Sequence, residues 1–353
     1  MAANITYHEQ TDMDNIRKLR EVLKTLPAFA KDYFRAIEPT TSTKTRISYA
    51  YDIRIFFQFL ISQNPSLAKI GIPNLNVSVL DQLKPIDIEE YMEYLKLYDS
   101  PNDQTTITNG ERGLKRKISS LRSFYTYYYK RQAIETNPVQ LVDMPKIHDK
   151  AIIRLDAGET AALLDYIEHC GDQLTGQRKA YYEKTKLRDL AIVTLLLGTG
   201  IRVSECVGLD VEDIDFRNNG IRLIRKGGSE MVVYFGLEVE KALKDYLEAR
   251  KAISPLEGHE HALFYSTQRK RIGVQAVENL VKKYARAITT TKKITPHKLR
   301  STYGTTLYQE TGDIYLVADV LGHKDVNTTK KHYAAMDDAR RRKAATAIRL
   351  RED

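Results

Sequence analysis

Cysteine is scarce in this sequence, which holds only Cys170 and Cys206 among 353 residues. The two do not stand at a metal-ligand spacing, so the pattern argues against a disulfide framework and against a structural zinc site. We also find no internal repeat and no low-complexity segment. What remains is the composition of an ordinary folded protein, with 42% hydrophobic and 29% charged residues.

Long apolar runs are absent as well. The longest, residues 190–197, is interrupted by Thr194 and stops at Gly198, which is too short to span a membrane. The first 18 residues are polar and contain no apolar signal-peptide core. We therefore expect a protein of the reducing cytoplasm without membrane contact.

Acidic residues are outnumbered by basic ones. The chain has 46 Asp and Glu against 55 Lys and Arg, which gives a net charge of +9 at pH 7. A positive balance of this size favours a polyanionic partner, and nucleic acid is the commonest one, although an ordinary basic protein would look the same. The length suggests two domains.

The first part of the chain has helical periodicity. We expect helices over residues 43–62, 85–97 and 108–131, with Pro85 in the first turn of the second one. One face of the third helix carries apolar and aromatic side chains, namely Leu114, Ile118, Leu121, Tyr125 and Tyr128. The rest of that helix carries cations that include Arg112, Lys115, Arg116, Arg122 and Lys130. Because Glu111 is its only acidic residue, we interpret this surface as a DNA-phosphate contact, with a solvated charged face as the alternative.

A proline-marked segment divides the chain. Asn137 precedes Pro138 and should end the helical part, because a residue before proline is disfavoured in a helix. We expect a helical domain over residues 1–140, a linker over 141–152 and a second domain over 153–353. In the second domain we expect helices at 156–170, 187–197, 237–251, 275–289, 296–310, 314–321 and 327–350, a β-hairpin at 220–235 and a short strand at 263–266.

The first motif with chemical potential is Thr199-Gly200-Ile201-Arg202-Val203-Ser204-Glu205. Its glycine lets the chain turn sharply after a buried helix. A short helix can then begin near Arg202, where free backbone N–H groups favour an anion and the guanidinium matches two phosphate oxygens. Glu205, one turn later, can orient Arg202 by an ion pair. A lone arginine of this kind is more often an ordinary surface residue.

The second motif lies near the C-terminus. His297 and Arg300 are three residues apart, so they project from one face of a predicted helix. Leu321-Gly322-His323 follows, with a glycine suited to the position after a helix end, and Tyr333 comes ten residues later. Metal binding by His297, His323 and His332 is the rival interpretation. It is disfavoured because no acidic or cysteine ligand accompanies them at a usual zinc spacing.

Taken in order, these features form a pattern. The chain has an arginine in a glycine turn, a lysine in a hairpin turn, His-x-x-Arg, Leu-Gly-His and a tyrosine near the C-terminus. This order and spacing resemble the catalytic signature of the tyrosine recombinases, the family of phage integrases and Xer-type resolvases. Residues 199–208 resemble its first box, and 297–300 with 321–333 resemble its second. The resemblance covers most of the chain, and residues 28–63 more loosely resemble single-recombinase Xer proteins of Gram-positive bacteria.

The resemblance implies a mainly α fold with a small β-sheet. A helical, SAM-like core-binding domain and a mixed α/β catalytic domain would clamp double-stranded DNA at a specific recombination site. The basic stretch 340–351 would dock onto a neighbouring subunit in a homo-tetramer on paired sites, and a solvated helix is an equal alternative. Neither a cofactor nor a metal is implied.

The resemblance also implies a role for each residue. Arg202 and Arg300 would bind the non-bridging oxygens of a phosphodiester, helped by hydrogen bonds from His297 and His323. Tyr333 would attack the phosphorus to form a 3′-phosphotyrosine, with His297 accepting its proton. Lys226, in the hairpin turn, would protonate the leaving oxygen. Nine residues separate His323 from Tyr333, one more than is usual in the family.

Three functions remain open at this point. The first is a site-specific recombinase, acting in chromosome dimer resolution or in the integration and excision of a mobile element. The second is a type IB topoisomerase, which shares the phosphotyrosine chemistry but acts as a monomer and needs no tail for subunit contacts. The third is a catalytically inactive DNA-binding regulator, against which the full set of catalytic residue types argues.

Overall fold

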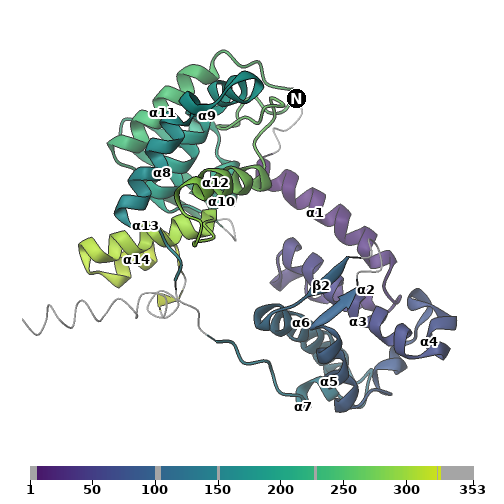
Figure 1. Ribbon diagram of the computed structural model, residues 1–353. Helices are drawn as coiled ribbons and strands as arrows, with labels where there is room; N and C mark the ends of the chain where they lie inside the picture. Colours follow the sequence, from purple (N-terminus) through teal and green to yellow (C-terminus); the bar gives the residue numbers. More distant parts are fainter. Residues whose placement is uncertain (1–5, 100–104, 149–151, 226–228, 324, 327–353) are drawn as a thin grey trace, which may run out of the picture. The chain divides into compact units, whose positions relative to one another are not determined.

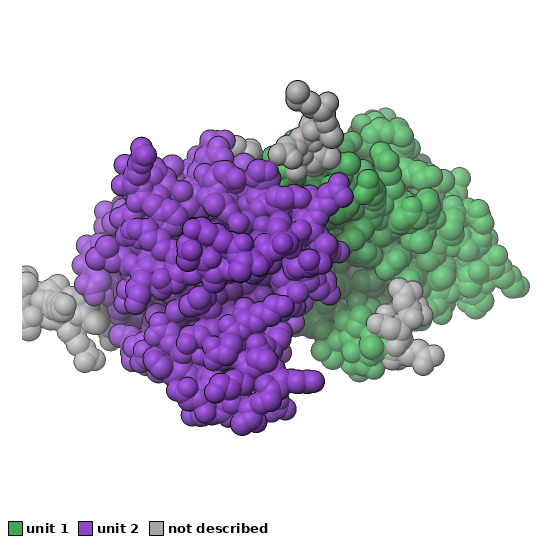
Figure 2. Space-filling model, turned by 90° about the horizontal axis from the view of Figure 1, so that it is seen from above, with its two compact units in different colours: residues 1–150 green, residues 151–353 purple. Residues whose placement is uncertain are grey.

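The computed structural model describes residues 6–99, 105–148, 152–225, 229–323 and 325–326. The chain divides into two compact units, residues 1–150 and 151–353 (Figure 2). Both are mainly helical and each contains a small antiparallel sheet, which confirms the predicted fold class (Figure 1). Within the described ranges, no helix is both long enough and apolar enough to cross a membrane.

The first unit is a set of helices with one short ribbon. Its helices are α1 (Tyr7–Lys24), α2 (Ala30–Ala36), α3 (Thr43–Gln63), α4 (Pro65–Ile70), α5 (Pro85–Tyr94), α6 (Glu111–Lys130) and α7 (Pro138–Leu141). The ribbon pairs β1 (Leu97–Asp99) with β2 (Thr106–Thr108), Tyr98 standing opposite Ile107. The three helices predicted here are confirmed as α3, α5 and α6, with small shifts at their ends. The ribbon escaped prediction because three-residue strands leave no readable alternation.

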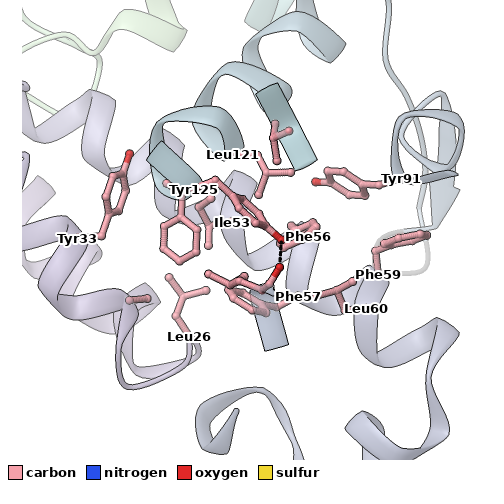
Figure 3. Close-up of a cluster of buried hydrophobic side chains, with 14 of the residues drawn as sticks. Leu26, Tyr33, Ile53, Phe56, Phe57, Phe59, Leu60, Tyr91, Leu121 and Tyr125 are labelled. Atoms are coloured by element: carbon pink, nitrogen blue, oxygen red, sulfur yellow. Dashed lines mark hydrogen bonds between the residues drawn. The ribbon is translucent and has the colours of Figure 1, made fainter. Parts of the chain in front are cut away.

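Aromatic and aliphatic side chains together form the core of the first unit (Figure 3). Phe57 on α3 meets Phe124 on α6 edge to face, with ring centroids 6.2 Å apart. Phe56 meets Tyr125 in the same way at 6.3 Å. The whole predicted apolar face of α6 is buried, as expected. Burying one such side chain contributes about 1.5–3 kcal/mol, so this face fixes α6 and thereby the direction of its cations.

Hydrogen bonds join the end of the first unit to α6. α6 ends at Lys130, and Pro138 begins the further short helix α7, so the prediction that Asn137-Pro138 ends the helical part was wrong. Arg122 Nη2 donates to the carbonyls of Val139 (3.1 Å) and Val142 (2.9 Å). Further on, Glu111 accepts a hydrogen bond from the backbone N–H of His148 at 2.9 Å, and its other oxygen lies 2.7 Å from Nδ1 of that histidine.

The second unit is built around one long helix, α9 (Gly176–Thr199). The other helices are α8 (Ala157–His169), α10 (Val203–Gly208), α11 (Leu237–Arg250), α12 (Val274–Ile288), α13 (Pro296–Thr311) and α14 (Ile314–Leu321). α8, α11 and α13 pack against α9, whose residues 191–193 and 195–196 are fully buried. The prediction that this helix begins at residue 187 was wrong. Residues 176–186 are mostly polar, so they lack the apolar periodicity of a buried helix. Tyr182 is the one residue among them whose ring is deeply buried.

A three-stranded antiparallel sheet completes the second unit. β3 (Ile214–Asp215), β4 (Gly220–Ile224) and β5 (Glu230–Tyr234) lie in that order, and Ile221 stands opposite Val233. β4 and β5 confirm the predicted hairpin. The strand predicted at 263–266 was wrong: Tyr265 forms only an isolated bridge with Arg271, and one residue pair does not make a ladder.

Candidate active site

A left-handed turn joins α9 to α10. α9 ends at Thr199, and Gly200 adopts φ +63°, as the glycine in this motif predicted. A Cβ on Gly200 would lie 2.3 Å from Cδ1 of Tyr303, which belongs to α13. Glycine is therefore required here by both the backbone angle and the space. The turn delivers Arg202 to the residue just before α10.

We expect Gly200→Ala to lower the free energy of unfolding more than Gly258→Ala. Both glycines have positive φ, +63° and +80°, so both variants carry the cost of left-handed backbone, roughly 1–2 kcal/mol. A Cβ on Gly258 meets nothing within 4 Å, whereas one on Gly200 collides with Tyr303. Urea denaturation of the two variants measures the difference. Equal losses would contradict the close contact between Tyr303 and this turn.

The ion pair expected between Arg202 and Glu205 is present. Nη1 of Arg202 lies 2.8 Å from Oε1 of Glu205, and the Arg202 backbone N–H donates to Oε2 at 2.7 Å. The Glu205 side chain is 6% exposed and that of Arg202 is 41% exposed, so a buried carboxylate holds an accessible guanidinium. Glu205 also takes up one of the backbone N–H groups that we expected to face an anion. The guanidinium itself is therefore the stronger anion-binding group of this turn.

Arg300 joins two helix ends. It lies one turn into α13 and is only 5% exposed. Its Nη1 donates to the carbonyl of Gly200 at 2.6 Å, and its Nη2 donates to the carbonyl of Leu321. Because a guanidinium stays protonated in proteins, a positive charge is fixed between the ends of α9 and α14. His297, three residues earlier on the same helix, has an exposed side chain.

Three arginines meet at the end of α14, which packs beside α13 (Figure 1). Three successive carbonyls accept their hydrogen bonds: Val320 from Arg225 Nη2 (2.9 Å), Leu321 from Arg300, and Gly322 from Arg202 Nη2 (3.4 Å). Carbonyls at a helix end lack intrahelical partners and form the negative end of the helix dipole, so they suit guanidinium groups. Residues separated by more than a hundred positions are thereby brought together.

His323 follows directly on this cluster. Gly322 adopts φ +61° and ends α14, as predicted for the residue past the helix. The backbone N–H of His323 donates to the carbonyl of Ala318 at 2.9 Å, which closes the turn. The sequence singled out Arg202, Arg300 and His323, and the fold thus brings all three to the same end of α14. Arg225 was missed, and its only signal in the sequence is its place beside Lys226 in the hairpin turn.

Several predicted features lie outside the described residues. Among them are Lys226, Tyr333, His332, the helix at 327–350 and the basic stretch 340–351. The part of the chain that the structure describes contains no group of three or more His, Cys, Asp or Glu that could hold a metal ion.

Two other tyrosines, Tyr303 and Tyr308, lie on α13, the helix that carries Arg300. Tyr308 is buried in a small apolar cluster with Val317 and Leu321. Burial raises the pKa of the Tyr303 phenol, whose ring covers Gly200. An attacking tyrosine must give up its proton, so burial makes Tyr303 a poor nucleophile.

Comparison with known proteins identifies the class. Residues 154–340 match the model of the phage integrase family. Tyrosine recombinase XerC of Caldanaerobacter subterraneus subsp. tengcongensis is 32% identical over 346 residues, covering 94% of this chain and 90% of that protein. Tyrosine recombinase XerS of Streptococcus equi subsp. zooepidemicus is 29% identical over 92% of this chain and 96% of its own length.

A solved structure has a similar fold. This chain is similar to the crystal structure of the XerH site-specific recombinase bound to a palindromic difH substrate in a post-cleavage complex. The TM-score is 0.64 at 19% identity, with 86% of this chain and 80% of that chain covered. The protein is a tyrosine-type site-specific recombinase acting on DNA. It belongs to the phage integrase family, and the two relatives named above are Xer recombinases.

Proposed function

We propose that Arg202, Arg300, His297, His323, Lys226 and Tyr333 carry out DNA cleavage in this recombinase, with Glu205 orienting Arg202. The observation that carries the proposal is the convergence on α14. Arg202 and Arg300 donate to adjacent carbonyls, Gly322 and Leu321, immediately before His323. Two cations beside the turn that carries His323 suit a phosphodiester, whose non-bridging oxygens gain negative charge in the transition state.

The cleavage step balances with these groups. The Tyr333 oxygen attacks phosphorus and its proton passes to His297, while the bond from phosphorus to the 5′-oxygen breaks. Lys226 supplies the proton that the leaving oxygen takes up. The 3′-phosphotyrosine conserves the energy of the broken bond, so a 5′-hydroxyl of another strand can reverse the step without nucleotide hydrolysis. Repeated at paired sites, this exchange passes through a Holliday junction.

We assign the first unit to DNA-phosphate contact, chiefly through α6. Arg112, Lys115 and Lys130 on that helix are exposed. Arg116 forms an ion pair with Asp52, whose carboxyl has its pKa raised by burial against the opposing effect of Arg116. Arg122 is occupied by two backbone carbonyls. We therefore rank Arg112, Lys115 and Lys130 first as phosphate contacts. Arg116 and Arg122 rank second, because each already binds a group of the protein.

Lys115→Ala is expected to weaken DNA binding without destabilising the protein. A lysine that contacts one phosphate releases about one counterion, so its loss should lower the slope of log K against log salt by about 1. Gel-shift titration of the full chain on random-sequence duplex at several salt concentrations measures this slope. Lys24→Ala is the matched control, because Lys24 is an exposed lysine paired with Glu21 on α1. An unchanged slope in Lys115→Ala would remove Lys115 from the interface.

We further propose that the protein acts in the cytoplasm as a homo-tetramer on paired recombination sites. The likeness to XerC, to XerS and to the phage integrase family leaves two roles open, chromosome dimer resolution and the integration or excision of a mobile element. Mapping the bound sites across the host chromosome separates the two. A single chromosomal site supports dimer resolution, and sites at the ends of a mobile element support integration.

A further inference from the structure

We infer that Arg225 is a positioning residue for DNA cleavage: it holds the Gly322–His323 turn in place beside Arg202. This inference rests on the proposed roles of Arg202 and His323. It assigns a function to a residue of the β4–β5 hairpin that the sequence motifs did not include.

Arg225 and Gly322 fit together as a matched pair. Arg225 follows β4, and its Nη2 donates to the carbonyl of Val320 at 2.9 Å. Its guanidinium lies directly on the glycine: a Cβ on Gly322 would come within 1.3 Å of Nη1 and 2.2 Å of Cζ. The backbone of Arg225 is held in place as well, because its N–H donates to the carbonyl of Ser229 at 2.9 Å. Glycine at 322 therefore serves the close approach of Arg225 as well as the backbone angle.

The position of Arg225 is unfavourable for stability alone. Burial lowers the pKa of its guanidinium, and the neighbouring charge of Arg202 acts in the same direction, against the acidic groups of Glu205 and Asp319. Its Nε is buried with no hydrogen-bond partner among the described residues. A buried donor without a partner and a second cation nearby both oppose folding. An arrangement with such costs is typical of a functional site.

The consequence concerns the geometry around the reacting phosphate. Arg202 reaches the turn only through a long contact, 3.4 Å from Nη2 to the carbonyl of Gly322. Arg225 anchors the carbonyl of Val320, two residues before Gly322, and covers Gly322, so it limits how far the turn can move relative to Arg202. A shift of about 1 Å in a catalytic group can cost about 10²-fold in rate. Loss of Arg225 should therefore affect catalysis through His323 and Arg202.

The test compares three full-length variants in single-turnover cleavage. The substrate is a nicked duplex carrying the site that the wild-type protein selects from a random DNA library. We expect Arg225→Ala to slow cleavage by about 10- to 100-fold with unchanged affinity for the site. Arg225→Lys keeps the positive charge but lacks the planar guanidinium, so it should recover part of the cleavage rate. Arg222→Ala is the matched control, because Arg222 lies on the same hairpin, is 55% exposed and pairs with Asp213.

Two further measurements separate positioning from a loss of folding. Guanidinium ion added to Arg225→Ala should restore part of the cleavage rate, which it would not do for a protein that is merely unstable. Urea denaturation checks that the variant folds. If Arg225→Ala does not fold, Arg225→Lys provides the same comparison with Arg222→Ala. Cleavage by the folded Arg225 variants at the rate of Arg222→Ala would overturn the inference.

A sulfur substrate identifies the group through which Arg225 acts. When sulfur replaces the bridging 5′-oxygen, the leaving thiolate needs no proton, so a defect in proton donation by Lys226 disappears. We expect the Arg225→Ala defect to persist on this substrate. Its disappearance would place Arg225 on the leaving-group side and overturn the inference.

Arg202→Ala distinguishes the two proposals. Normal cleavage by Arg202→Ala would refute the proposed site itself. An inactive Arg202→Ala beside a normal Arg225→Ala would refute this inference alone.

Discussion

Replacing Arg300 with alanine is expected to lower the rate of DNA cleavage about 10²–10³-fold. Arg300 is buried, and its two Nη atoms donate to the carbonyls of Gly200 and Leu321. The substitution thus removes a positive charge from the site and releases the two turns that carry Arg202 and His323. Both effects act on the position where the transition state gains negative charge.

Arg300→Ala should also destabilise the protein. A buried carbonyl left without a donor costs about 1–3 kcal/mol, and Arg300 serves two of them. Arg202→Ala leaves the buried Glu205 carboxylate without its ion-pair partner, so it too should lower the free energy of unfolding, and cleavage rates are compared in folded protein. Single-turnover cleavage of a nicked substrate and urea denaturation measure the two effects, with Arg222→Ala as the control. A folded Arg300→Ala protein that cleaves at the wild-type rate would remove Arg300 from the site.

The local parts of the site could be predicted from the sequence. A glycine after an apolar helix indicates a helix end, and this was enough to place turns at Gly200 and Gly322. An acidic residue three positions after Arg202 was enough to predict their ion pair. These features depend on neighbours within one or two helical turns, and the local sequence contains all the residues that form them.

Contacts between distant segments could not be predicted in this way. Arg225 donates to a carbonyl 95 residues away, and nothing in its own neighbourhood indicates α14 as its partner. The same holds for the cations of α6. The helical wheel separated Arg116 and Arg122 from the apolar face, but it could not show that Asp52 and the carbonyls of Val139 and Val142 bind them. A wheel gives the direction of a side chain and says nothing of the segment that it meets.

Replacing Tyr333 with phenylalanine is expected to abolish the covalent link to DNA completely, because no other group in the proposed mechanism can form the phosphotyrosine. Tyr333 is the only tyrosine in the sequence after Leu321-Gly322-His323. The unperturbed pKa of tyrosine is about 10, so the cationic groups of the site would favour its reactive phenolate. Tyr303 is the matched control. Its phenol pKa is raised by burial, and Tyr303→Phe should still form the adduct.

The extra residue between His323 and Tyr333 makes the identity of the nucleophile the central question, since one residue turns a helix by roughly 100°. The most direct measurement traps the covalent complex on a nicked suicide substrate, digests it and locates the nucleotide-bearing peptide by mass spectrometry. We predict that the DNA is joined to the oxygen of Tyr333. An adduct on any other tyrosine, or one still formed by Tyr333→Phe, would contradict the proposed mechanism.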